Sequence, residues 1–294
     1  MKTLVIGGTG KVGSMVAAGL LKQGVMVRVM SHSPDKLKKL PTGVEGYRAD
    51  LDDPDTLPEA FVGINSVFLL NAVGPNETNE GLSAVSAAKA AKVKKIVYMS
   101  VIMPVVGSER IPHFRSKLPV EKAVRESGIA YTILRPNNFF QNDLRMKDAI
   151  MQYGVYPQPI GKMGLNRVDV RDIADCAINA LLKSGYENET YEVHGPDILT
   201  GEGIAGIYTK HLGQEVRYGG DDIDAWAERS KGAMPEFLIA DLRIMYRFFQ
   251  DNGMIASKND LEKTEKLLGR KPRIFDAFVK ELTLEWRSKM AKAA

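Results

Sequence analysis

The sequence predicts an α/β fold, a doubly wound parallel sheet with a smaller, mainly helical region toward the C-terminus. Three observations indicate it. Short runs rich in Val, Ile and Leu alternate with longer helical patterns through the first two-thirds of the chain. A glycine-rich turn follows the first of these runs. After Pro136 the alternation loosens, and the last part of the chain reads mainly as helix.

The predicted strands are short and apolar, as strands buried on both faces of a parallel sheet should be. They cover residues 3–6, 26–30, 45–48, 66–70, 95–99 and 131–134. Helices are predicted between them over 10–22, 80–91 and 114–127, with a shorter one near 53–61. Farther along we expect a helix near 171–183, a strand near 191–193, and helices over 201–212, 223–231, 236–251, 258–268 and 273–289.

Composition excludes several classes of protein. An apolar share of 44% in 294 residues is typical of a globular chain and too high for a disordered one. The net charge of +4 is too mild to indicate a nucleic-acid partner, and the single cysteine excludes a disulfide framework or a cysteine-based zinc site, so no metal is expected. No apolar run approaches the roughly 18 residues of a membrane span. The first strand begins at once, so we expect no secretion signal and a cytoplasmic protein.

The most specific motif is Gly7-x-x-Gly10-x-x-Gly13, which directly follows the first predicted strand and opens a helix. A bound pyrophosphate needs a tight turn, a bare backbone and free N–H groups at a helix N-terminus, and this motif supplies all three. The sheet is therefore predicted to be of the Rossmann, dinucleotide-binding type. The loop residues expected at the cofactor are Gly7, Thr9, Gly10, Lys11, Val12 and Gly13.

The end of the second strand bears on the choice between NAD and NADP. An acidic residue there would bind the ribose hydroxyls and repel a 2′-phosphate. This chain has Ser31, His32 and Ser33 instead, with Lys36 one helical turn later. Hydroxyls and a cation suit a phosphate, so we predict NADP(H), with NAD(H) as the alternative.

Other candidate residues follow the later strands. Asp50 can accept a hydrogen bond from an adenine amino group or cap the helix near 53–61, and both interpretations stay open. Asn137 and Asn138 can bind the nicotinamide carboxamide or the substrate, while Phe139 and Phe140 either wall the pocket or belong to the core. The remaining residues expected at the cofactor are Leu51, Asn71, Ala72, Ser100, Val101 and Pro136.

This glycine loop occurs together with further motifs along nearly the whole chain. They are Arg48-Ala49-Asp50-Leu51-Asp52-Asp53, His113-Phe114-Arg115-Ser116-Lys117, Ile133-Leu134-Arg135-Pro136, Val168-Asp169-Val170-Arg171-Asp172 and Leu268-Gly269-Arg270-Lys271-Pro272. With them the sequence resembles the NmrA-like family of atypical short-chain dehydrogenases/reductases. The resemblance implies an NAD(P)-binding fold and a function found among its members, which include quinone and azo-dye reductases, benzylic-ether reductases and NADP-sensing regulators.

The chain departs from the wider superfamily at the active site. The superfamily uses Tyr-x-x-x-Lys, but none of the 10 tyrosines here has a lysine four residues later. His113-x-x-x-Lys117 stands at the equivalent place, a spacing that puts both side chains on one helix face. The related benzylic-ether reductases use the lysine at this position for catalysis, which by resemblance makes Lys117 a catalytic candidate with His113. Alternatively, Lys117 only holds the ribose and His113 is an ordinary helix residue.

These observations favour an NAD(P)H-dependent reductase that passes a hydride to a small hydrophobic acceptor, such as a quinone, an azo compound or a conjugated carbonyl. An NADP-sensing regulator without turnover is the second hypothesis, which the missing tyrosine favours. A sugar-nucleotide epimerase or dehydratase is disfavoured, because it needs the absent pair. Residues 1–135 would form the cofactor-binding core, with 165–195 returning to it. Residues 136–164 and 196–294 would cover the substrate in one compact chain, for which the sequence leaves a homodimer open.

Overall fold

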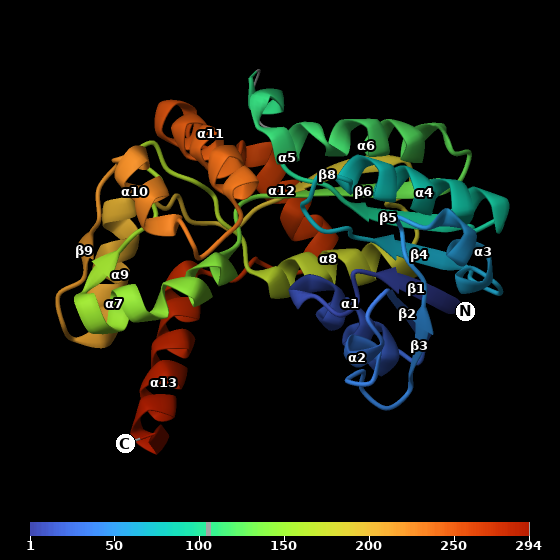
Figure 1. Cartoon of the computed structure of the whole chain (residues 1–294), viewed down its shortest axis with the longest axis horizontal. Coiled ribbons are helices and arrows are strands. Elements are labelled where there is room, and N and C mark those ends of the chain that lie inside the picture. The colour runs from blue at the N-terminus through green and yellow to red at the C-terminus, as the bar shows by residue number, and fades with distance from the viewer. Residues whose placement is uncertain (104–106, 294) are drawn as a thin grey trace.

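The computed structural model describes residues 1–103 and 107–293, and the side chains as far as residue 289. Its centre is a parallel sheet of seven strands in the order β3-β2-β1-β4-β5-β6-β8 (Figure 1). The strands are β1 (Lys2–Ile6), β2 (Met26–Ser31), β3 (Val44–Arg48), β4 (Ser66–Leu69), β5 (Lys95–Met99), β6 (Ala130–Pro136) and β8 (Glu189–Val193). The predicted doubly wound, Rossmann-type sheet is confirmed.

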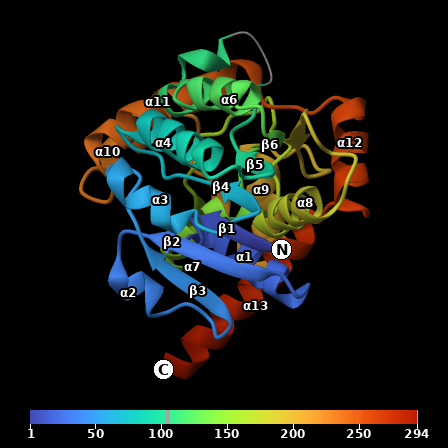
Figure 2. The same ribbon diagram turned by 90° about the vertical axis from the view of Figure 1, so that its right-hand side faces the viewer.

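Helices cover both faces of the sheet (Figure 2). Residues alternate between the faces, so Val5 joins one apolar core while its neighbours Leu4 and Ile6 join the other. The first core lies under α1 (Lys11–Lys22) and α8 (Val170–Leu182). The second lies under α3 (Leu57–Ala60), α4 (Glu77–Ala90) and α6 (Lys117–Glu126). This double burial explains why the strands are continuously apolar.

The helices α4 and α6 approach each other closely at Gly81. A Cβ atom on Gly81 would lie 2.5 Å from Cγ2 of Val120 on α6. Both helices return over the sheet against the strand direction, so both begin at the carboxyl edge of the strands. This packing brings Glu77, the first residue of α4, to Lys117, the first residue of α6.

A helical region with its own aromatic core lies beyond the carboxyl edge (Figure 1). It comprises η3 (Phe140–Met146), α7 (Lys147–Tyr153), α9 (Gly201–Leu212), α10 (Ile223–Ser230), α11 (Glu236–Asn252) and α13 (Phe275–Ala293). It also contains a small parallel pair, β7 (Val155–Tyr156) with β9 (Arg217–Tyr218). Two-residue strands carry too little pattern to be predicted from sequence. We call this region the lid.

The C-terminal segment returns to the sheet between two lid helices. The helix α12 (Lys258–Leu268) lies between two lid helices in the sequence. In the structure it packs against β8 and α8. Its Thr264 hydroxyl donates to the Glu192 carbonyl and accepts from the His194 N–H. Just beyond it, Arg270 and Arg273 both bind the fully buried Asp172 of α8. This segment therefore closes the β8 side of the sheet.

Two predicted helices differ in the structure. The helix expected over 114–127 is split into α5 (Pro112–Arg115) and α6, which meet at Ser116. Pro119 has no N–H to donate to the Arg115 carbonyl, so one helical bond is missing at this junction. The helix expected near 53–61 is a 3₁₀ turn, η1 (Pro54–Thr56), followed by the short α3. Two further short helices are α2 (Pro34–Leu37) and η2 (Ser108–Arg110). Within residues 1–103 and 107–293, no helix combines the length and apolar character needed to cross a bilayer.

Candidate active site

The sheet topology brings the candidate cofactor residues to one edge. They follow β1, β2, β3, β4, β5 and β6, which are parallel and end on the same side. The chain reverses its direction of winding between β1 and β4, and open α/β sheets bind ligands at such a switch point. The glycine loop after β1 lies at this point.

The glycine loop is shaped by contacts that leave no room for side chains. Gly7 has φ +78°, and a Cβ there would lie 2.3 Å from the Leu70 carbonyl oxygen. A Cβ on Gly13 would lie 2.2 Å from the Gly7 carbonyl oxygen, so α1 packs directly on the loop. Gly10 precedes α1 without a side-chain cap, which leaves first-turn N–H groups for a ligand. The loop thus fits a dinucleotide pyrophosphate.

Lys11 connects this loop to the lid. Its Nζ lies 3.5 Å from the Gln141 carbonyl oxygen on η3. Burial lowers the pKa of Lys11, and the charge of Arg145 lowers it further. A cation is therefore held where the glycine loop meets the lid.

The segment after β2 is organised by its own hydroxyl groups. Ser31 Oγ accepts from the Ser33 N–H at 3.2 Å, and Ser33 Oγ caps α2 by accepting from the Lys36 N–H at 3.4 Å. The side chains of His32 and Lys36 are exposed. No acidic side chain stands at residues 31–33, so the segment fits the predicted preference for a 2′-phosphate.

Asp50 and Asn71 differ in how completely their side chains are bonded. Asp50 Oδ1 accepts from the Asp52 N–H at 3.1 Å, and η1 begins after Asp53, so Asp50 does not cap that helix. Asn71 is buried, and its Nδ2 donates to the Glu77 carbonyl oxygen at 2.5 Å. Its Oδ1 is buried without a hydrogen-bond partner among the described residues, an acceptor that a ligand donor would satisfy.

Ser100, at the end of β5, turns its hydroxyl toward α6. Its Oγ donates to Glu121 Oε1 at 2.6 Å, and Arg135 binds both oxygens of the same carboxylate. Burial alone would raise the pKa of Glu121, but the bonds from Arg135 and Ser100 outweigh it and hold that pKa below its usual range. The Ser100 side chain thus holds α6 in place at the cofactor edge.

Lys117 forms a buried ion pair at the start of α6. Its Nζ donates to Glu77 Oε1 at 2.5 Å, and the other Glu77 oxygen accepts from Ser116 Oγ at 2.6 Å. Lys117 is 5% exposed and Glu77 is 1% exposed. Thr78 Oγ1 also donates to the Ser116 carbonyl oxygen at 2.7 Å. The ammonium group is therefore fixed between the starts of two helices at the carboxyl edge.

His113 binds a partner in the lid. Its Nδ1 lies 2.5 Å from Asp241 Oδ1 of α11, and its backbone N–H donates to Asp241 Oδ2 at 2.9 Å. In Figure 1, α5 stands between the sheet and α11. His113 and Lys117 are thus neighbours in the chain but are held by carboxylates from different regions.

The residues after β6 are engaged inside the protein. Asn137 Oδ1 accepts from the Asn138 N–H, and its Nδ2 donates to the Met254 carbonyl oxygen and to His194 Nδ1. Asn138 Oδ1 accepts from Arg167 Nε at 3.0 Å. Phe140 is fully buried in the lid core, whereas Phe139 is half-buried. Both hydrogens of the Asn137 amide are thus used inside the protein, and its contact with the nicotinamide carboxamide stays a prediction.

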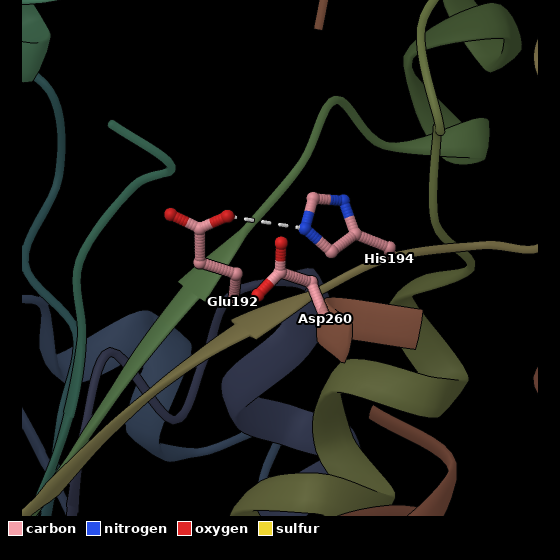
Figure 3. A group of neighbouring side chains, drawn as sticks. All are labelled: Glu192, His194 and Asp260. Atoms are coloured by element: carbon pink, nitrogen blue, oxygen red, sulfur yellow. Dashed lines mark hydrogen bonds and ion pairs between the residues drawn. The ribbon is translucent and has the colours of Figure 1, made fainter. Parts of the chain in front are cut away.

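Three potential metal ligands gather behind this segment: Glu192, His194 and Asp260 (Figure 3). Because the Asn137 amide presents Nδ2 to His194 Nδ1, that nitrogen accepts, and Nε2 carries the proton that it donates to Glu192 Oε2 at 3.3 Å. Asp260 is occupied by the capping box of α12 with Ser257. The ring nitrogen that faces the carboxylates has no lone pair to offer a cation, so we assign this group a structural role.

A pocket of about 670 Å³ opens between η2, α10 and α11. Apolar Ile111, Ile223 and Phe248 line it, together with the charged residues Arg110, Arg243, Arg247, Asp224 and Asp251. It shares no residue with the candidate cofactor set. Its volume falls in the range of small-molecule sites.

Sequence reasoning missed the carboxylates that organise the site. Glu77 resembles an ordinary first-turn acid, and Asp241 lies 128 residues from His113. It also missed the buried pair of Arg167 with Asp143, at 2.8 Å, which joins the segment after β6 to the lid. An acid inside an otherwise apolar helical stripe, as at Asp241, is the signal that could have drawn attention to it.

Comparison with known proteins places this chain in a family. The model of the NmrA-like family matches residues 1–279. The chain belongs to the NmrA-like family. It is 32% identical over 279 residues to an NAD(P)H azoreductase of Xenophilus azovorans, covering 94% of this chain and 96% of that relative. It is 27% identical over 272 residues to quinone oxidoreductase 2 of Escherichia coli, covering 90% and 92%.

Solved structures share the fold. An NADPH-dependent quinone oxidoreductase from Escherichia coli, complexed with NADPH, superposes with a TM-score of 0.86 at 24% identity, covering 96% of this chain and 99% of that one. A triphenylmethane reductase from Citrobacter, complexed with NADP(H), gives 0.84 at 22% identity, covering 95% and 99%. The lid is therefore part of the shared fold.

Proposed function

We propose that this NmrA-like protein is an NAD(P)H-dependent reductase whose acceptor is a small hydrophobic quinone, azo compound or conjugated carbonyl. The bare glycine loop at the sheet's switch point carries the proposal, because its shape suits a dinucleotide. The apolar, aromatic lid beyond the same edge suits a hydrophobic acceptor. The relatives named azoreductase and quinone oxidoreductase support the reaction class.

Each candidate residue has a proposed part. The loop of Gly7, Gly10 and Gly13 would bind the pyrophosphate, and Ser31 with Lys36 the 2′-phosphate of NADP(H). Lys117 would hold the nicotinamide ribose. When bound, the reduced nicotinamide supplies a hydride to the acceptor. Lys117, His113 or a water molecule then supplies the proton that completes the reduction.

Consumption of NADPH across a panel of quinones, azo dyes and enones tests this function. Turnover with one or more classes is the expected result. Tight NADP(H) binding without turnover would contradict the reductase function. It would support the second candidate function, an NADP-sensing regulator, which the absence of a Tyr-x-x-x-Lys pair favours. The homodimer and the cytoplasmic location suggested by the sequence stay predictions, to be tested by analytical ultracentrifugation and cell fractionation.

Cofactor preference has a separate test at the end of β2. Ser31→Asp should weaken NADP(H) binding and leave NAD(H) binding equal or better, because a carboxylate repels the 2′-phosphate and accepts from ribose hydroxyls. Calorimetric titration of both cofactors measures this, with the neutral Ser31→Asn as the control. An unchanged ratio of the two dissociation constants would show that Ser31 lies away from the 2′-position.

A further inference from the structure

Asp241 contacts His113 through both of its carboxylate oxygens. One carboxylate oxygen lies 2.5 Å from the ring Nδ1, and the other accepts from the backbone N–H of the same residue at 2.9 Å. Asp241 is 6% exposed, so this double contact is shielded from water. A side chain fixed through both its ring and its own backbone has little freedom to rotate.

This contact determines which ring nitrogen is available. An ionised carboxylate only accepts hydrogen bonds, so Nδ1 must carry a proton toward Asp241. Nε2 is then the nitrogen that gains and loses a proton. Nε2 makes no hydrogen bond to any residue within 1–103 or 107–293, while the His113 side chain keeps 13% of its surface exposed. The free nitrogen is therefore open to a ligand.

We propose that Asp241 is a positioning residue for proton transfer by His113, an inference that rests on the proposed reductase function. Hydride addition to a carbonyl leaves a negatively charged oxygen. The His113 imidazolium breaks its Nε2–H bond, a new O–H bond forms on the acceptor, and the ring becomes neutral with Nδ1–H on Asp241. Water returns the proton to Nε2. Asp241 stabilises the imidazolium and keeps the correct tautomer.

The position of Asp241 makes this arrangement depend on the lid. Ile111, which precedes α5, and Ala240, next to Asp241 on α11, both line the 670 Å³ pocket. The His113–Asp241 contact joins α5 to α11 beside it. His113 is therefore oriented for proton transfer only while α11 is docked against α5.

The variant Asp241→Asn tests whether Asp241 positions the His113 ring or only attaches α11 to α5. The amide has one oxygen where the carboxylate has two, so it can satisfy both the backbone N–H and the ring only if its Nδ2 donates to Nδ1 and the ring proton moves to Nε2. We expect kcat to fall roughly 10–100-fold, with the KM for NADPH unchanged within about twofold. His113→Gln should lower kcat by a similar factor. Glu236→Gln, an exposed acid-to-amide change on the same helix, is the control and should leave kcat unchanged.

Nitrogen-15 NMR of the imidazole groups provides a readout that needs neither cofactor nor turnover. The His113 signals are assigned by their loss in His113→Gln. In the unmodified protein, at a pH high enough to make the ring neutral, we expect Nδ1 protonated and Nε2 bare, and in Asp241→Asn a mixture of tautomers. A neutral His113 with its proton on Nε2 overturns the proposal, as does full kcat in folded Asp241→Asn. If no acceptor is turned over, the reductase function fails, while the tautomer still decides the role of Asp241.

Discussion

Lys117 is a buried cation whose carboxylate partner, Glu77, is buried as well. Such a pair is costly to remove from water and even costlier to break, because one charge is then left unpaired in a dry environment. Its location at the start of α6, on the edge that carries the glycine loop, suits a donor to the nicotinamide ribose. The pair therefore has both a structural role and a proposed role in binding.

Replacement of Lys117 separates these roles. Lys117→Met should weaken NADP(H) binding by about 1–3 kcal/mol, since a charge-assisted hydrogen bond is lost. The double variant Lys117→Met with Glu77→Gln removes the stranded carboxylate and should recover stability but not affinity. Calorimetry and thermal unfolding measure the two effects, with exposed Lys122→Met on the same helix as the control. If folded Lys117 variants bind and turn over normally, this lysine does not touch the cofactor.

The contacts of single residues also show why part of the site was not predictable. Apolar runs and glycine spacing are local patterns, so the seven strands of the main sheet and the glycine turn that opens α1 were predicted correctly. The partners of these residues come from distant positions, 40 residues away for Glu77 and 128 for Asp241. Periodicity reports that a position is buried, not which group it meets there. Asn137 illustrates the limit, because its amide meets Met254 and His194 rather than solvent.

Among the elements, α4 and α6 form the support of the site, and Gly81 sets their separation. Gly81→Ala would place a methyl group 2.5 Å from Val120 and push the helices apart. We expect an overpacking cost of about 1–3 kcal/mol, partly offset by the higher helix propensity of alanine. Chemical denaturation should show a net loss of stability, together with weaker NADP(H) binding because the Glu77–Lys117 pair is displaced.

Gly206 on α9 is the matched control for this substitution. It is also a helical glycine, but it is exposed and has nothing within 4 Å of the position of a new Cβ. Gly206→Ala should stabilise the protein by up to about 1 kcal/mol through helix propensity alone. A Gly81→Ala variant as stable as Gly206→Ala would contradict the close packing of α4 and α6.

Glu121 links α6 to β5 and β6, and its ionisation makes the stability of this packing depend on pH. Its pKa in the folded protein is lowered, so its stabilisation is complete above the unfolded value near 4.5 and is lost as the pH falls through the folded value. Glu121→Gln should therefore cost about 3 kcal/mol at neutral pH, and the difference from the unmodified protein should shrink below about pH 4.5. Urea denaturation at several pH values measures it. A difference that is constant down to acid pH would contradict an ionised Glu121.

For the whole molecule, the lid and the sheet are joined by a buried ionic centre. Arg167 donates to both oxygens of Asp143, and to the Phe139 carbonyl oxygen at the end of the β6 segment. Tyr156, Tyr208 and Gln158 of the lid bind the same carboxylate. Both charged side chains are almost inaccessible to water. This centre ties the first residues beyond the sheet to the core of the lid.

Asp143→Asn tests whether the two regions unfold together. The substitution leaves the Arg167 guanidinium buried without a countercharge and should cost about 3–5 kcal/mol. We expect one cooperative transition at a lower temperature in calorimetry, whereas Asp148→Asn, on exposed α7, should have little effect. Two separate transitions in the variant would show that this centre is what couples the unfolding of the lid to that of the sheet. A variant as stable as the unmodified protein would contradict the ion pair.

The binding of Asp172 by Arg270 and Arg273 affects the order in which parts of the chain can fold during synthesis. The ribosome releases α8 about one hundred residues before these arginines, as their sequence separations of 98 and 101 require. During that interval the carboxylate at the start of α8 lacks its countercharges, so α8 cannot settle on the nascent sheet without stranding an anion. The cofactor-binding half, although it is synthesised first, is therefore completed last. The β8 side of the sheet in a growing chain therefore stays open until the final helices emerge.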